Sequence, residues 1–182
     1  RNRASAFGRD LAGQVGATLR IETIGTAPNQ VCVIQWKNFR KYAATGDAFD
    51  FQIRLNQTSN LVQFVYGPAT FNTTSSTCQV GLGGAATTEF INRSSTTSWA
   101  ASTPGTTNAA SMTFLNTIYP ASGLTYSFGP MAPLAAVYSS PTNGSTGMPT
   151  TVSLNWAPNT GDGGGAPQGY MVYMGTDVPP TN

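Results

Sequence analysis

The stretch Asp50–Gly67, DFQIRLNQTSNLVQFVYG, contains two adjacent strand-like patterns around which the rest of the chain is organised. Residues 51–55 alternate apolar with polar side chains, which is the period-two pattern of a half-buried strand. The turn-favouring run 56–60 interrupts this pattern, and residues 61–66 follow with β-branched and aromatic side chains. The stretch therefore predicts a β-hairpin. Because an isolated hairpin is only marginally stable in water, other strands must cover it.

Further strands are expected on both sides of the hairpin, without any long helix. Short alternating or apolar runs bounded by Gly, Pro, Asn and Ser predict strands at 17–24, 30–37, 49–56, 60–66, 78–83, 111–116 and 124–129. Residues 1–13 and 85–110 contain few apolar anchors, so we expect extended or loop segments there. The fold class expected is all-β, with an antiparallel, jelly-roll-like β-sandwich over residues 1–130.

Charged side chains are scarce in this chain. They make up 9% of 182 residues, with a net charge of +2, whereas soluble domains usually contain about 25%. The one basic cluster, Lys37, Arg40 and Lys41, is interpreted as a solvated rim rather than a nucleic-acid surface. No apolar run approaches the roughly 20 residues of a membrane span. We therefore expect neither nucleic acid as a partner nor a membrane span, and no secretion signal is visible in this segment.

A second pattern begins after the segment Gly129–Pro133, whose Gly and Pro residues indicate a linker. Alternation over 152–156, and again over 170–174, predicts strands with a glycine-rich loop between them. Residues 131–182 are therefore expected to form a linker and a partial immunoglobulin-like β module.

Several blocks in a fixed order carry a resemblance to a known family. They are GTAPN (25–29), VIQWKN (33–38), FQIRL (51–55), FVYG (64–67), VGLGG (80–84) and YPASGL (119–124). Over roughly residues 15–130 the chain resembles a repeated domain of large secreted and cell-surface proteins of Bacteroidota-type bacteria, and more distantly nidogen-like extracellular domains. Residues 134–182 resemble the first half of a fibronectin type III module, with Trp156 matching its core tryptophan.

This resemblance implies an extracellular or cell-surface protein that is exported by type IX secretion. The implied roles are adhesion, matrix or gliding-associated structure, or an accessory module on a secreted hydrolase. The family supplies no catalytic residues to carry over.

The chain has no histidine, which removes the commonest general base and most zinc sites. The one close pair of carboxylates is Asp47 and Asp50. These could ligate calcium, but Asp also commonly occupies turns. Because six to eight oxygen ligands are not visible around the pair, the turn interpretation is favoured and no cofactor is expected.

Two further residue types leave alternatives open. Cys32 and Cys78 are expected on strands of one core, and an even cysteine count in a secreted protein favours a disulfide over two buried thiols. Trp36 and Trp156 lie on alternating strands and are interpreted as core residues. Trp99 lies in a polar segment, so it is the better candidate for contact with a ligand such as a glycan.

These observations predict a non-catalytic, extracellular structural or adhesive segment. Its partners would be other proteins or copies of itself, bound through β surfaces in a filamentous or surface assembly. In that assembly, strands from outside would complete the partial module. The alternative is a carbohydrate-binding accessory module of a secreted hydrolase, with a glycan as its ligand.

Overall fold

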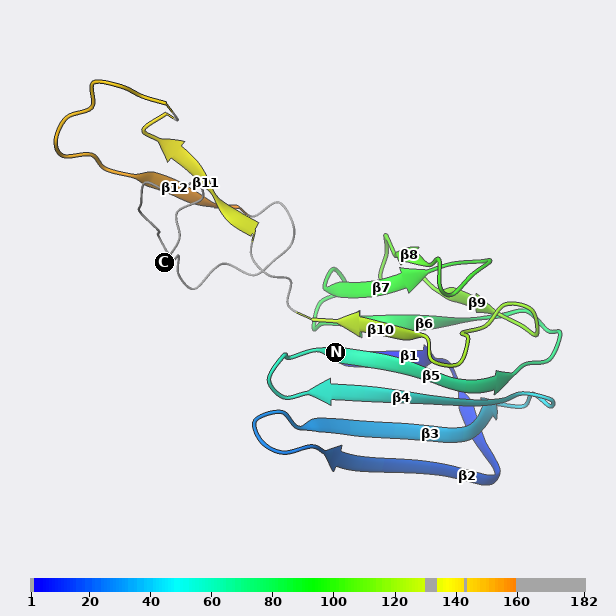
Figure 1. Cartoon of the computed structure of the whole chain (residues 1–182). Coiled ribbons are helices and arrows are strands. Elements are labelled where there is room, and N and C mark those ends of the chain that lie inside the picture. The colour runs from blue at the N-terminus through cyan, green and yellow to red at the C-terminus, as the bar shows by residue number, and fades with distance from the viewer. Residues whose placement is uncertain (1, 130–133, 143, 160–182) are drawn as a thin grey trace. The chain divides into compact units, whose positions relative to one another are not determined.

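The computed structural model describes residues 2–129, 134–142 and 144–159 of the chain. The chain divides into two compact units, Arg1–Gly129 and Pro130–Asn182 (Figure 1). The named strands pair antiparallel and no described residue is helical, so the expected all-β class is confirmed. Among the described residues there is no helix that is long and apolar enough to cross a membrane.

One sheet of the first unit is built around the hairpin. Its strand order is β10-β5-β4-β3-β2, and its strands are β2 (Leu11–Ile24), β3 (Val31–Lys41), β4 (Ala48–Asn56), β5 (Val62–Thr70) and β10 (Thr125–Phe128). In the hairpin register Phe51 lies opposite Tyr66 and Ile53 opposite Phe64, and all four side chains are buried. The predicted alternation therefore selects the face that packs on the core.

The facing sheet has the order β1-β6-β7-β8, and β9 also pairs with β6. Its strands are β1 (Arg3–Gly8), β6 (Ser76–Gly83), β7 (Phe90–Ser94), β8 (Thr103–Pro104) and β9 (Met112–Phe114). In Figure 1 β6, β7 and β8 lie in the upper part of the unit and β4, β3 and β2 in its lower part, and buried residues of both sheets form one core. Sequence alone did not predict β1, β7 and β8, because these strands are short or irregular.

Aromatic rings fill the space between the sheets. The buried aromatic side chains are Phe7, Phe49, Phe51, Phe64, Tyr66, Phe71, Trp99, Phe114, Tyr126 and Phe128. They come from both sheets and from the connecting loops, and many ring pairs stack or meet edge to face. Burial of this apolar area is the main favourable contribution to folding of the unit.

The second unit contributes one described pair of strands, β11 (Leu134–Ser140) and β12 (Asn155–Asn159), which pair antiparallel with Val137 opposite Ala157. The strand predicted over 152–156 thus begins later, at Asn155. The strand predicted over 170–174 and the glycine-rich loop before it lie outside the described residues.

Candidate functional site

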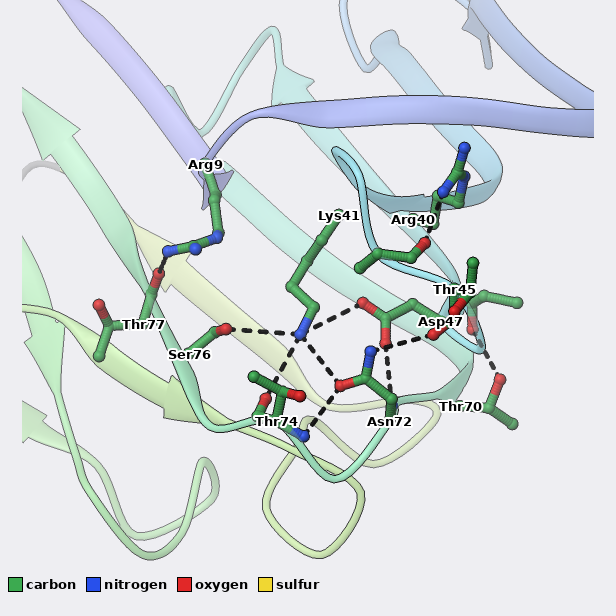
Figure 2. A network of polar contacts seen from close by, with 12 residues as sticks. Arg9, Arg40, Lys41, Thr45, Asp47, Thr70, Asn72, Thr74, Ser76 and Thr77 are labelled. Carbon is green, nitrogen blue, oxygen red and sulfur yellow. Dashed lines mark hydrogen bonds and ion pairs between the residues drawn. The ribbon is translucent and has the colours of Figure 1, made fainter.

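Three polar side chains meet where the ends of β3, β4 and β5 come together. Lys41 is the last residue of β3, Asp47 directly precedes β4, and Asn72 follows β5 by two residues. Ala48 pairs with Thr70, which places Asp47 and Asn72 side by side. Figure 2 shows the three side chains turned toward one another.

Lys41 faces the interior because β3 contains a bulge. Ile34 and Trp36 pack against the core, and strict alternation would turn residues 38 and 40 inward after them. The register instead shifts between Trp36 and Phe39, with Asn38 at a φ of 57°, so Phe39 and Lys41 take the inward side. The expectation of a solvated cationic rim is therefore wrong for Lys41.

The charged pair in this cluster is almost fully buried, with Lys41 4% and Asp47 1% exposed. Lys41 Nζ lies 3.5 Å from Asp47 Oδ2. The ammonium also donates to Asn72 Oδ1, Thr74 O and Ser76 Oγ, each at 3.4 Å. Asp47 Oδ2 accepts no hydrogen bond from the described residues, and its contact with Lys41 Nζ is an ion pair. The ammonium is therefore surrounded by four oxygens, and none of them lies closer than 3.4 Å.

The amide of Asn72 is held in one orientation by two backbone groups. Its Nδ2 donates to Thr45 O at 3.0 Å, and its Oδ1 accepts from Thr74 N at 3.0 Å. One partner can only accept and the other can only donate, so they distinguish the oxygen from the nitrogen of the amide. The backbone N–H of Asn72 donates to Asp47 Oδ1 at 2.9 Å, which fixes the carboxylate as well.

Aromatic rings close the inner side of the cluster. Lys41 Nζ lies 5.2 Å from the centroid of the Phe114 ring, within the range of a cation–π contact. Phe71 packs edge-on against Phe114 with centroids 5.2 Å apart. On the outer side lies a polar pocket of about 370 Å³, lined by residues that include Arg9, Tyr42 and Lys41. The cluster thus lies between the aromatic core and a polar opening.

Asp50 does not join this cluster. Its Oδ1 accepts the backbone N–H of Asn38 at 2.7 Å, whereas Asp47 faces Lys41 and the Asn72 backbone. The described residues hold no group of three or more His, Cys, Asp or Glu side chains placed to bind a metal ion. The two carboxylates that could have ligated calcium therefore have separate protein partners.

The expected disulfide is wrong, because Cys32 and Cys78 are free thiols. Cys32 lies near the start of β3, in one sheet, and Cys78 in β6, in the other. Cys78 is buried, whereas Cys32 is only partly buried.

The expected role of Trp99 in ligand contact is also wrong. The side chain is 2% exposed, and its indole N–H donates to Thr113 O at 2.8 Å. The ring stacks on Phe7 and meets Tyr66 edge to face, with centroids 5.8 and 5.2 Å apart. Although Trp99 comes from a loop, it is a core residue.

A second hollow in the first unit is apolar. This groove of about 670 Å³ is lined by residues of β1, β6 and β7 together with Val62, and includes Leu82, Phe90 and Ile91. Its lining includes one aromatic ring, that of Phe90, and two charged residues, Arg3 and Glu89.

A family model described as NIDO related matches residues 1–130. No curated protein and no solved structure matches the chain.

Proposed function

The chain belongs to the NIDO-related family, which is nidogen-like, and from this premise we propose that it is a non-catalytic, extracellular structural or adhesive segment. Its location on the cell surface or outside the cell follows from the same proposal. The chain contains few charged residues, and its polar side chains are mostly those of Ser, Thr, Asn and Gln, which supports this assignment.

The proposal rests on one observation: the polar groups at the candidate site bind one another and the protein backbone. Lys41 and Asp47 are buried against each other, and Asn72 is bound by backbone groups on both sides of its amide. These contacts join the ends of β3, β4 and β5 to the segment that leads from β5 into the second sheet. An enzyme instead aims such groups at a substrate, so the arrangement supports a structural role.

Partners that bind through β surfaces are part of the proposal. β2 lies at the end of its sheet order among the described strands, and Leu19, Ile21 and Ile24 on it are exposed. An exposed apolar edge strand is a template for pairing with another chain. Another protein or a second copy of this chain would pair there.

Residues 131–182 are proposed to be part of a fibronectin type III-like module whose remaining strands come from outside. The antiparallel pairing of β11 with β12, among the described residues of this unit, supports an immunoglobulin-like β module. Type IX secretion and a Bacteroidota-type source belong to the same proposal. A C-terminal sorting domain in the complete reading frame would support them, and a different export signal there would contradict them.

The carbohydrate-binding alternative loses its main support because Trp99 is buried. A glycan array tests it directly, and specific binding to one glycan class would restore it.

The structural or adhesive role is tested in the source organism by an in-frame deletion of residues 1–129. We expect the shortened protein to reach the cell surface while attachment of the cells to surfaces or to each other decreases. Unchanged attachment, with the shortened protein present at its normal level, would contradict the role.

A further inference from the structure

The buried cluster combines three groups that can react with one another. Lys41 supplies a primary amine, Asn72 a primary amide and Asp47 a carboxyl group, and all three meet beside the ring of Phe114. We propose that Lys41 and Asn72 form an intramolecular isopeptide bond, with Asp47 carrying the proton. This bond would deepen the proposed structural function, since it makes the contact between the strand ends covalent.

The distances around Lys41 Nζ fit an amine that reacts better than they fit a stable ion pair. Charge-assisted hydrogen bonds are usually 2.7–2.9 Å long, whereas the four oxygens around Lys41 Nζ lie at 3.4 to 3.5 Å. A buried pair offsets its desolvation cost only when its geometry is good and its remaining lone pairs are bonded. Asp47 Oδ2 lacks a hydrogen bond from the described residues, so it is placed to take a proton from Nζ.

The amide of Asn72 is prepared for attack at its carbonyl carbon. The Thr74 N–H donates to Oδ1 at 3.0 Å, so it can stabilise the negative charge that develops there when a nucleophile adds. Lys41 Nζ is 3.4 Å from the same oxygen. Thr45 O holds Nδ2 on the other side, so the amide cannot rotate away from the amine. Fixing both reactants in contact in this way supplies much of the advantage of an intramolecular reaction.

The proposed step balances without any co-reactant. The Lys41 ammonium gives one proton to Asp47, and the resulting amine adds to Cγ of Asn72 to form the Nζ–Cγ bond. A second proton moves from Nζ to Nδ2 as the Cγ–Nδ2 bond breaks, and ammonia leaves. In water the ammonia takes the proton from Asp47 and restores the carboxylate. The polar pocket beside the cluster gives the ammonia a route out.

The bond would connect two parts of the sandwich. Lys41 ends β3, and Asn72 lies in the connection from β5 to β6, which leads from one sheet to the other. The bond would therefore span the intervening strand β4 and fix the sheet to this connection.

The test is the intact mass of the folded chain, measured under denaturing conditions. We expect a mass lower than that of the sequence by one ammonia molecule, and a branched peptide containing both Lys41 and Asn72 after digestion. The full sequence mass in folded protein would overturn the proposal. Loss of one water molecule, with a branch at Asp47, would equally overturn the assignment to Asn72.

Variants identify the groups involved. Asp47→Ala and Asn72→Ala are each expected to retain the full mass of their sequence, whereas Lys37→Ala, which changes the exposed lysine of β3, should still lose ammonia. Intrinsic tryptophan fluorescence, to which buried Trp99 contributes, reports whether each variant folds. If a variant fails to fold, the mass of the unaltered chain still decides the proposal. Because that mass does not depend on adhesion, failure of the crosslink and failure of the proposed function can be distinguished.

Discussion

Trp99 meets Tyr66 edge to face, with ring centroids 5.2 Å apart, and so joins a loop to the central hairpin. The Tyr126 hydroxyl donates to the backbone carbonyl of Trp99, which fixes the loop from the other side. The aromatic core therefore holds a segment that has no regular secondary structure over residues 96–102.

Replacement of this tryptophan should destabilise the first unit strongly. Trp99→Ala removes the largest fully buried side chain, so we expect the free energy of unfolding to fall by about 3–5 kcal/mol. Chemical denaturation measures the change. Tyr42→Ala, at an exposed position, is the control and should stay within about 0.5 kcal/mol. Equal small effects of the two variants would contradict the burial of Trp99.

The two thiols should differ in reactivity. Burial raises the pKa of the Cys78 thiol far above its usual range, although Arg9 opposes the shift, and the thiolate is the reactive form. Cys32 is only partly buried. In native protein we expect a thiol reagent to modify Cys32 well before Cys78, and in denaturant both. A chain that takes up no reagent in denaturant without a reductant would instead contain the disulfide that the structure rejects.

Stability should fall at alkaline pH. Burial raises the pKa of Tyr66 well above its usual value, with smaller contributions from Cys78 and Tyr126, and burial also raises the pKa of Tyr126 itself. The folded chain thus keeps protons that the unfolded chain releases, so stability is full below the unfolded pKa values, about 8.5 for Cys and 10 for Tyr, and declines above them.

The melting temperature between pH 7 and 11 checks this decline. Tyr66→Phe removes one titrating group, so its melting temperature should fall less steeply above about pH 10 than that of the unaltered chain. Parallel slopes for the two proteins would show that Tyr66 does not contribute.

Removal of the crosslinking amide should reduce stability while leaving the charged pair in place. Asn72→Ala keeps Lys41 and Asp47 but prevents the bond, and opening a loop of this length costs about 3–4 kcal/mol in the chain-entropy account. Thermal unfolding compared with Asn116→Ala, a change at an exposed asparagine, measures the difference. A loss below about 1 kcal/mol would argue against a crosslink in the unaltered chain.

The hairpin could be predicted from sequence because its periodicity is undisturbed. Phe51, Ile53, Phe64 and Tyr66 alternate without a bulge and are all buried. Leu55 follows the same alternation but is 40% exposed, because it lies next to the turn, where the facing sheet covers it less. Alternation thus identifies which side chains point inward, but not how far along the strand the facing sheet buries them.

The candidate site could not be predicted, because its position depends on an irregularity. The bulge near Asn38 exchanges the two faces of β3 and turns Lys41 inward, and no pattern in the sequence marks it beyond the asparagine itself. The burial of Trp99 could not be predicted for a related reason. Its loop is shaped by local turns, such as those in which Ser95 Oγ accepts from residues 97 and 98, and these leave no periodic signal.

The most direct test of the buried, crosslinked cluster uses the fact that Lys37 and Lys41 are the two lysines of the chain. An amine-reactive reagent is applied first to native protein and then in denaturant, and peptide mass spectrometry locates the label. We predict that Lys37 is labelled in both conditions and Lys41 in neither, because its amine is part of an amide bond even when the chain is unfolded. Labelling of Lys41 in denaturant would contradict the crosslink, and labelling of Lys41 in native protein would contradict its burial as well.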